Sequence, residues 1–435
     1  MSVRPLATGA DLWALARSHP QRYPHLLDTA LIGQAPARFS ILFAFPGAQL
    51  TGDAVLDGLA GIGPFDAMRE PEPPPGLPFA GGWFVYLGYE LAWSIEPSLG
   101  ACTPDPWLPS AVLTRFPAAL IVDHWERRSY FVDEDDDPQR WDQVRADLAG
   151  VGDADPAEWP PMQLDEDDPE DYRQAVRRAL RYIRDGDCFQ ANLSREWRIR
   201  SSRPWDTADV YARLRRANPA PFAAWLRLPG GEVLSSSPER LVAVRHGVAE
   251  TRPIAGTRRR DADAMKDHAL SSDLKVNRKE IAEHVMLVDL ERNDLGRVAV
   301  PGSVCVPEFM TIESYRRVHH IVSSVQARLR PGATPADLLR ACFPGGTITG
   351  CPKIRSMQII RELEQGASRG AYTGSCGYIS RDGRMDTNIL IRTFVVRGQD
   401  LRFRTGAGIV ADSDPEAELQ ETRHKAQGLL DALTS

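Results

Sequence analysis

The sequence predicts a globular protein in which helices and strands are mixed, and three observations support this. The chain has 435 residues, of which 43% are hydrophobic and 26% charged, which is ordinary for a soluble globular protein with a sizeable core. Residues 1–164 carry short apolar segments between Gly and Pro, which is typical of strands and turns. Over residues 165–435, helical and strand patterns alternate. A polar segment that ends near residue 164 is the expected boundary between the two regions.

Charge and cysteine content exclude several classes of partner. The net charge is −7 with both signs interspersed, so we expect neither a basic stripe for nucleic acid nor a polybasic segment for a membrane. The six cysteines lack C-x-x-C spacing, which argues against a disulfide framework and a structural zinc site. No window reaches the roughly 18 apolar residues of a membrane span, and the N-terminus shows no apolar leader core. We therefore expect a cytoplasmic protein that acts on a small molecule.

An acidic helix is predicted over Lys279–Arg297, ending in an Arg-Asn-Asp-x-Gly-Arg turn. Its buried stripe is expected at Ile281, Val285 and Val288. Glu280, Glu283 and Glu291 would then lie off that stripe. Because Glu280, Glu283 and His284 fall within one turn, a hard cation could bind there through oxygen ligands. The alternative is an ordinary solvated acidic face.

The second region is expected to begin with a capped helix and a strand that has one polar face. Asp168 is a suitable N-cap followed by Pro169, and the helical pattern ends at Gly186. The next segment alternates apolar and polar residues, which predicts a strand. Its polar face is expected to carry Gln190, Asn192 and Ser194. A hairpin is predicted to turn at Pro229–Gly231.

Two motifs in the last hundred residues place charged side chains on predicted helices. Residues 343–353 are predicted to form a loop between two helices, with adjacent glycines, hydroxyl groups and Lys353 at the following helix start. Backbone N–H groups and one cation suit an anion. The last helix is expected to start at Asp414-Pro415. One of its faces is expected to carry Glu418, Glu421 and Lys425.

A series of motifs runs through the second region. They are PIAGT, AEHVMLVDLERNDLGR, HHIVS, FPGGTITGCPK, MDTNILIRT, GAGIVADS and QETRHKA. In this order and spacing they closely resemble the chorismate-utilising enzymes, and the resemblance is dense from about residue 165 to 430. It implies an α+β fold in which two large antiparallel sheets pack as a sandwich with helices outside. It also implies that residues 165–435 form a chorismate-binding catalytic domain with a magnesium-dependent reaction.

The resemblance implies which residues bind the magnesium ion. The metal ligands correspond to Glu283 and Glu421, on the acidic helix and the last helix. Chorismate is a dianion, and Mg²⁺ dehydrates reluctantly, so few protein carboxylates completed by water and a substrate carboxylate would suit it. Glu280 and Glu418 are auxiliary candidates, or are simply solvated.

The resemblance also implies the substrate contacts. Residues for the carboxylate of the enolpyruvyl arm correspond to Tyr372, Arg392 and the backbone of Gly406, Ala407 and Gly408. A guanidinium fork and closely approaching amides suit a carboxylate, the alternatives being a packed tyrosine, a salt-bridged arginine and a plain turn. Further substrate contacts correspond to Gln190, Gly256, Thr257 and Thr347.

Three residues correspond to catalytic positions in the resemblance. Glu239 matches the position proposed as the general acid that protonates the departing C4 hydroxyl, which requires a raised pKa. His320 matches an active-site histidine, whereas its neighbour His319 is expected to be structural. Lys353 is expected to face the anionic site.

Two positions bear on the reaction within the family. Gln190 stands where members that add water carry a lysine base, which favours ammonia as nucleophile. Ala255 stands where aminodeoxychorismate synthases carry the lysine of PIKGT, whereas anthranilate synthases have PIAGT as here. At four other places the chain resembles the aminodeoxychorismate synthases more than the anthranilate synthases. These are Asn192-Leu193, His319-His320, Gly345-Gly346 and Thr349. We therefore expect 4-amino-4-deoxychorismate, a step toward para-aminobenzoate and folate, with anthranilate and pyruvate as the alternative products.

The segment LLDTA stands where anthranilate synthases that are inhibited by tryptophan carry an LLES-type motif. This difference does not favour inhibition by tryptophan.

The source of ammonia is expected to lie outside this chain. No G-x-C-x-G motif surrounds any of the six cysteines, so the nucleophile of glutamine hydrolysis is missing. Ammonia would come from solution or from a separate glutamine amidotransferase subunit. An alternative of another class is an inactive homologue that only binds a ligand, and it should have lost an acidic ligand or the arginine. The acidic ligands and the arginine are all present, which favours an enzyme.

Overall fold

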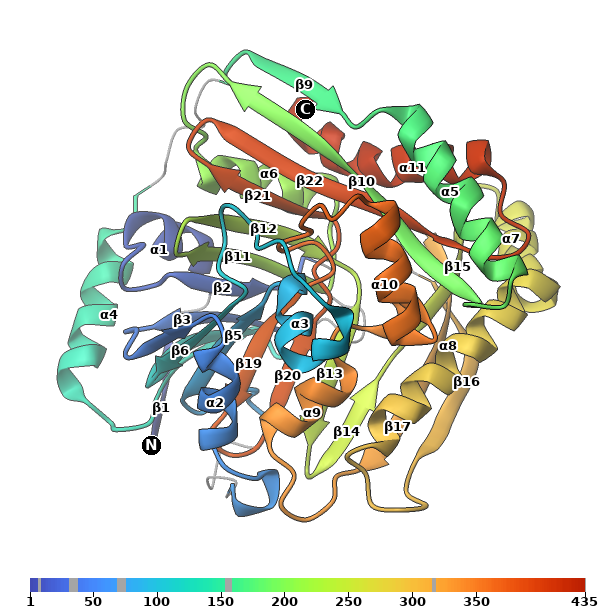
Figure 1. Cartoon of the computed structure of the whole chain (residues 1–435). Coiled ribbons are helices and arrows are strands. Elements are labelled where there is room, and N and C mark those ends of the chain that lie inside the picture. Colours follow the sequence, from blue (N-terminus) through green and yellow to red (C-terminus); the bar gives the residue numbers. More distant parts are fainter. Residues whose placement is uncertain (7–8, 31–37, 69–75, 153–158, 315–317, 435) are drawn as a thin grey trace.

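The computed structural model describes residues 1–6, 9–30, 38–68, 76–152, 159–314 and 318–434. In this part of the chain two large antiparallel sheets pack against each other and helices cover their outer faces (Figure 1). The predicted fold class is therefore confirmed. Aromatic side chains fill much of the space between the sheets, and the ring of Phe43 lies 5.6 Å from that of Phe84 on the opposite sheet.

The first sheet has twelve strands, in the spatial order β1 (Ser2–Leu6), β8 (Arg128–Asp133), β7 (Ala118–Asp123), β3 (Phe39–Ala44), β2 (His25–Asp28), β11 (Phe222–Leu228), β12 (Gly231–Ser237), β21 (Thr393–Arg397), β22 (Asp400–Ile409), β10 (Gln190–Ser201) and β18 (Gly350–Cys351), with β9 (Met162–Glu166) paired to β10. The second sheet has ten strands, in the order β15 (Ile254–Arg259), β17 (Val318–Arg328), β14 (Val248–Thr251), β13 (Arg240–Arg245), β20 (Met385–Asn388), β19 (Ser375–Ser380), β5 (Gly82–Leu87), β6 (Ala111–Phe116) and β4 (Gln49–Thr51), with β16 (Cys305–Ser314) paired to β17.

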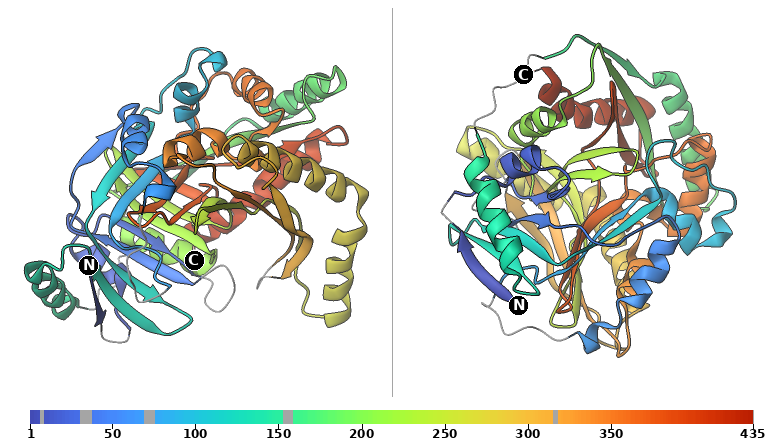
Figure 2. Two further views of the ribbon diagram at one scale, coloured as in Figure 1. Left: turned by 90° about the horizontal axis from the view of Figure 1, so that it is seen from below. Right: turned by 90° about the vertical axis from the view of Figure 1, so that its left-hand side faces the viewer.

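Helices pack on the outer face of each sheet through apolar side chains. The first sheet is covered by α1 (Leu12–Ser18), α4 (Pro138–Gly150), α5 (Pro169–Arg184), α6 (Thr207–Ala217), α10 (Lys353–Leu363) and α11 (Pro415–Thr434). The second sheet is covered by α2 (Ala54–Gly61), α3 (Ala92–Ile95), α8 (Arg278–Gly296) and α9 (Pro335–Cys342), with α7 (Ala264–Val276) beside β15 and β17. The described residues also form the 3-10 turns η1 (Phe65–Ala67), η2 (Tyr89–Leu91), η3 (Pro97–Leu99) and η4 (Gly346–Ile348). The helices α4 and α7 lie at opposite ends of the molecule (Figure 2).

Both regions of the sequence contribute strands to each sheet. In the first sheet β2 pairs with β11, and in the second β5 pairs with β19. The boundary expected at residue 164 falls within β9, and the polar segment before it lies partly at residues 153–158, outside the described residues. No helix in the described ranges is long and apolar enough to cross a membrane.

Several predicted elements are confirmed. Asp168 accepts a hydrogen bond from the backbone N–H of Glu170 and caps α5, and the segment after Gly186 forms β10. Strands β11 and β12 form the predicted hairpin, and the loop between α9 and α10 lies where expected. The last helix, α11, begins at Pro415 as predicted, because Asp414 accepts hydrogen bonds from two N–H groups of the first turn.

Candidate active site

The paired strands β10 and β22 form the base of the candidate site. Asn192 lies opposite Gly408 in the ladder. A Cβ atom on Gly406 would lie 2.6 Å from the hydroxyl of Tyr372, and one on Gly408 would lie 2.1 Å from Nε2 of Gln190. At Gly406 the backbone carbonyl of Leu193 would also lie 2.6 Å away, so a side chain there would clash, whereas at Gly408 the amide of Gln190 would have to move. The structure thus places Tyr372 and Gln190 beside the Gly-Ala-Gly segment.

The two predicted metal ligands are both tethered to this strand pair. Nε2 of Gln190 donates a hydrogen bond of 3.2 Å to Oε1 of Glu283 on α8. On α11, Nζ of Lys425 lies 2.7 Å from Oε1 of Glu421 and donates a hydrogen bond of 3.0 Å to the carbonyl of Gly406. Carboxylates from two helices that are distant in sequence therefore approach neighbouring positions of one strand pair.

The two auxiliary carboxylates are held by the protein rather than freely solvated. Oε1 of Glu280 lies 3.0 Å from Nη1 of Arg258, and its other oxygen would lie 2.7 Å from a Cβ atom on Gly256. Gly256 has φ +66° at a bulge in β15, a conformation that favours glycine. Glu418 is buried, and burial of Tyr172 followed by the charge of Glu418 raises the pKa of Tyr172.

The predicted cation site within one turn of α8 is wrong. His284 is buried, and its Nε2 lies 2.6 Å from Oγ of Ser323 on β17, away from Glu280 and Glu283. The described residues contain no group of three or more His, Cys, Asp or Glu side chains that could hold a metal. A magnesium site formed by Glu283 and Glu421 would accordingly need further oxygen ligands from substrate or water.

The predicted buried stripe of α8 is confirmed at Val288, which is buried, but is wrong at Val285. Val285 is 43% exposed, whereas Glu291, which was expected off the stripe, is 6% exposed. The buried face instead follows His284, Val288, Glu291 and Leu295. Counting the helical period from His284 rather than from Ile281 would have placed Glu291 on the buried face.

Glu239 lies in the environment that a general acid requires. It follows β12 and is buried, and Oγ1 of Thr347 in η4 donates it a hydrogen bond of 2.8 Å. Burial raises the pKa of Glu239 to about 7, although Thr347, Lys425 and Arg392 each oppose the rise. A large share of this carboxyl is therefore protonated at neutral pH.

Arg392 lies near both Glu239 and His320. Arg392 has φ +52°, a backbone conformation that is uncommon for a residue with a side chain and recurs at functional sites. Its charge acts on both Glu239 and His320. Burial lowers the pKa of His320 to about 4, and the positive charge of Arg392 contributes to this shift. The imidazole is therefore neutral at pH 7. On the neighbouring strand, Thr257 is the backbone partner of His320.

A buried charged cluster near the loop between α9 and α10 was not predicted. Lys353 does not face open space: its Nζ lies 2.6 Å from Oδ2 of Asp294 and donates to the carbonyl of Cys342. Glu291 lies beside this pair, and burial, followed by the charge of Asp294, raises its pKa to about 8. A Cβ atom on Gly346 would lie 3.2 Å from Oε1 of Glu291. The cluster therefore supports the loop that carries Thr347.

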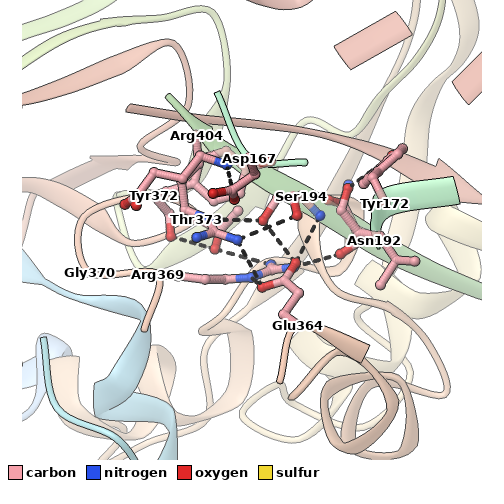
Figure 3. Close-up of polar contacts among 12 residues, drawn as sticks. Asp167, Tyr172, Asn192, Ser194, Glu364, Arg369, Gly370, Tyr372, Thr373 and Arg404 are labelled. Carbon is pink, nitrogen blue, oxygen red and sulfur yellow. Dashed lines mark hydrogen bonds and ion pairs between the residues drawn. The ribbon is translucent and has the colours of Figure 1, made fainter. Parts of the chain in front are cut away.

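A second unpredicted network lies directly beneath β10 (Figure 3). Oε1 of Glu364 accepts hydrogen bonds of 2.8 Å from both the N–H and the hydroxyl of Ser194, and lies 2.6 Å from Nη2 of Arg369. The guanidinium of Arg404 lies 3.4 Å from the other carboxylate oxygen. Arg369 also lies 5.6 Å from the ring centroid of Tyr372. This network holds β10 and Tyr372 together, and no local sequence pattern signals it.

A large cavity of the described structure lies elsewhere, lined by residues of both sheets. Its volume is about 1090 Å³, and Asp28 of the LLDTA segment, Phe222 and Arg240 contribute to its lining. None of the predicted site residues lines it. The candidate active site therefore rests on its convergent polar side chains and not on cavity size.

Comparison with known proteins places this arrangement in a family. The family description "chorismate binding enzyme" matches residues 45–431. A protein of Klebsiella aerogenes called aminodeoxychorismate synthase component 1 is 39% identical over 95% of this chain and 94% of its own length. The chain belongs to the chorismate-binding enzymes.

Two further relatives of the chain are called anthranilate synthase component I or a protein like it. A Synechocystis protein called anthranilate synthase component I-like is 45% identical over 83% of this chain and 74% of its own length. The crystal structure of anthranilate synthase component I from Streptococcus pneumoniae superposes with a TM-score of 0.79 at 31% identity, covering 92% of this chain and 93% of that chain. The fold is thus that of the chorismate-binding enzymes, and relatives with either name are similar to the chain.

Proposed function

We propose that the chain catalyses the magnesium-dependent amination of chorismate with ammonia to 4-amino-4-deoxychorismate. The observation that carries amination is the environment of Gln190. Its amide nitrogen donates to Glu283, so the position offers no side-chain base that could deprotonate water. Relatives called aminodeoxychorismate synthase component 1 support the choice of product.

A bound Mg²⁺ would be held by Glu283 and Glu421 and would supply positive charge to a chorismate carboxylate. The donor set fits such an ion, because it consists of carboxylate oxygens tethered to one strand pair by Gln190 and Lys425. Two protein carboxylates leave positions for water and substrate oxygen. Removal of either carboxylate should therefore affect turnover much more than stability.

The chain's own residues would bind chorismate and move one proton. Arg392, with Tyr372 and the amides of residues 406–408, would bind the carboxylate of the enolpyruvyl arm. Glu239 would protonate the C4 hydroxyl as its C–O bond breaks and water leaves. The nitrogen of ammonia forms the new C–N bond and then loses one proton, which balances the proton that Glu239 gave. With His320 neutral, Lys425 and Arg392 supply the positive charges that act on Glu239.

Anthranilate synthesis is the second candidate, and a specific observation favours it. Ala255 is buried in β15 opposite Ile321, so this position offers no amine to attack C2. Relatives called anthranilate synthase component 1 are also similar in sequence, at 38% identity for the Streptomyces coelicolor protein. The products separate the two reactions, because anthranilate synthesis also releases pyruvate.

Ammonia would be delivered by a separate glutamine amidotransferase subunit. Cys342 and Cys376 are buried, and burial raises the pKa of Cys376 to about 12. Burial also raises the pKa of the Cys351 thiol. Such thiols are poor nucleophiles at neutral pH. These cysteines are thus better suited to packing than to glutamine hydrolysis.

The purified chain is expected to consume chorismate with ammonium and Mg²⁺, and not with glutamine. Glutamine should support the reaction only after an amidotransferase subunit is added, since the chain has no nucleophile motif for its hydrolysis. The loss of chorismate absorbance measures both reactions. If no chorismate is consumed at millimolar ammonium, the proposal that the chain is an enzyme is rejected. If the single chain turns over chorismate with glutamine, the proposal of a separate amidotransferase subunit is rejected.

The pH dependence of kcat/KM is expected to follow the protonation of Glu239. Because burial raises the pKa of Glu239 to about 7, the acid form is lost as the pH rises through that value. We expect kcat/KM for chorismate to fall with a slope of one proton above about pH 7, measured at constant free ammonia. Glu239→Gln should be slower by about 10²- to 10⁴-fold. A profile that stays flat to about pH 9, or an active Glu239→Gln variant, would exclude Glu239 as the acid.

A further inference from the structure

A glutamate of the first region binds the backbone of the loop that carries Tyr372, which we call the Tyr372 loop (residues 364–374, between α10 and β19). Glu90 belongs to η2 and is 7% exposed. Its Oε1 accepts hydrogen bonds of 2.6 Å from the N–H of Arg369 and 3.2 Å from that of Gly370, and its Oε2 lies 3.1 Å from the same N–H of Gly370. One carboxylate, 279 residues before Arg369, therefore satisfies two consecutive buried N–H groups.

The Tyr372 loop forms a tight turn at the residues that these bonds hold. The N–H of Tyr372 donates a hydrogen bond of 3.0 Å to the carbonyl of Arg369, which closes a four-residue turn. Gly370 has φ +58°, and a Cβ atom there would lie 2.4 Å from Oδ2 of Asp105. The carbonyl of Gly370 accepts a hydrogen bond of 2.8 Å from the N–H of Tyr89. The peptide groups on both sides of Gly370 are thus bound by adjacent residues of the first region.

The ionised form of Glu90 suits these contacts best. A carboxylate only accepts hydrogen bonds, and its bonds from N–H groups are stronger than those of a neutral acceptor. Burial raises the pKa of Glu90 to about 7, and the N–H groups of Arg369 and Gly370 oppose the rise. At about pH 8 the side chain is therefore mostly a carboxylate.

The turn determines where the Tyr372 hydroxyl lies. This hydroxyl lies 2.6 Å from the position of a Cβ atom on Gly406, in the segment proposed to bind the carboxylate of the enolpyruvyl arm. It is the side-chain atom farthest from the backbone, so a small rotation of the turn displaces it more than the rest of the ring. Figure 3 shows Arg369, Gly370 and Tyr372 on this loop. The guanidinium of Arg369 lies 5.6 Å from the ring centroid of Tyr372 and 4.9 Å from that of Tyr89, so the first region also packs against this end of the loop.

We propose that Glu90 is a positioning residue that sets the affinity for chorismate by holding the turn that carries Tyr372. The inference rests on the proposed function, in which Tyr372 binds the carboxylate of the enolpyruvyl arm. This carboxylate does not change during amination at C4, so its contact contributes equally to the substrate complex and to the transition state. Loss of such a contact raises the KM for chorismate and leaves kcat unchanged.

The test is steady-state chorismate consumption by the full chain with ammonium chloride and Mg²⁺ at about pH 8, where Glu90 is ionised. Glu90→Met removes both acceptor oxygens at similar side-chain length. Its KM for chorismate should rise about tenfold, while kcat and the KM for ammonium stay within about twofold. Glu90→Gln keeps one acceptor oxygen and should recover part of the affinity. It also covers the case in which Glu90→Met does not fold, which the unfolding midpoint shows.

A double-variant cycle separates positioning from a general structural role. Tyr372→Phe removes only the hydroxyl and should itself raise the KM for chorismate about tenfold. The double variant Glu90→Gln/Tyr372→Phe should have the same KM as Tyr372→Phe alone, because Glu90 acts on the KM through that hydroxyl. A general structural role would instead make the two effects multiply.

The matched control is Glu96→Gln, since Oε1 of Glu96 likewise accepts a hydrogen bond from a backbone N–H, that of Ser98 in η3. It should leave both KM values unchanged. The proposal is overturned if the folded Glu90 variants keep the wild-type KM for chorismate, or if the effects of Glu90→Gln and Tyr372→Phe multiply. Failure of the proposed function is a different result, in which the wild-type chain itself does not consume chorismate with ammonium.

Discussion

Replacing Glu283 or Glu421 by glutamine is expected to lower turnover by about a thousandfold or more and to leave the fold intact. Each change removes one of two negative charges proposed to hold Mg²⁺ while keeping the side-chain volume. The stability effect should be small for Glu421, because the side chains of Glu421 and Lys425 are 47% and 46% exposed. Exposed ion pairs of this kind contribute at most about 1 kcal/mol.

The measurement is kcat at a series of magnesium concentrations, with the unfolding midpoint as the check on folding. Asp289→Asn is the matched control, since this carboxylate lies on the same helix with 68% of its side chain exposed, paired to Arg292. It should retain wild-type turnover. If both glutamine variants work at full rate when magnesium is limiting, the metal ligands have been assigned to the wrong residues.

Arg369→Met is expected to destabilise the protein by about 3–5 kcal/mol. The substitution keeps the length of the side chain but leaves the buried Glu364 without its closest cation, which now lies 2.6 Å away. It also removes the donor to the Asn192 carbonyl and the contact with Tyr372. Arg369 and Arg404 hold the pKa of Glu364 below its usual value despite burial, so the carboxylate stays ionised in the folded protein at neutral pH.

Urea unfolding at neutral pH measures this loss, with Arg145→Met as the control. Arg145 pairs with Asp142 on the surface of α4, where the side chains are 63% and 67% exposed. Its loss should change the unfolding free energy by no more than about 0.5 kcal/mol. An Arg369→Met variant as stable as the Arg145→Met variant would contradict a structural role for the buried network.

The sign of the pH effect on this network follows from the lowered pKa of Glu364. The folded-state pKa lies below the value in the unfolded chain, so the stabilisation is present above the unfolded value and is lost as pH falls through the folded one. The Arg369→Met variant and the wild-type protein should therefore converge in stability on the acid side.

Local patterns predicted the elements whose cause is local. The cap at Asp168, the alternation that becomes β10 and the cap at Asp414 each depend on a few neighbouring residues, and all three are found. The short helix α1 was missed in the strand-rich first region, because its 7 residues provide less than two full helical periods.

Long-range contacts account for what the sequence could not predict. Lys353 contacts Asp294 from a distant segment, and the loop residue Gly346 packs against the buried Glu291. The network of Glu364, Arg369 and Arg404 likewise joins separate segments through charge. A local sequence pattern predicts that a glutamate on a helix is exposed to solvent. Tertiary packing determines whether it is buried instead.

Product identity in the ammonium reaction of the wild-type chain tests the proposed amination at C4 most directly. The reaction with chorismate and Mg²⁺ is analysed by mass and by fluorescence, with and without an added lyase. We predict 4-amino-4-deoxychorismate as the product, and no pyruvate until the lyase is present. Release of pyruvate together with fluorescent 2-aminobenzoate from the chain alone would contradict this and would identify the reaction as anthranilate synthesis.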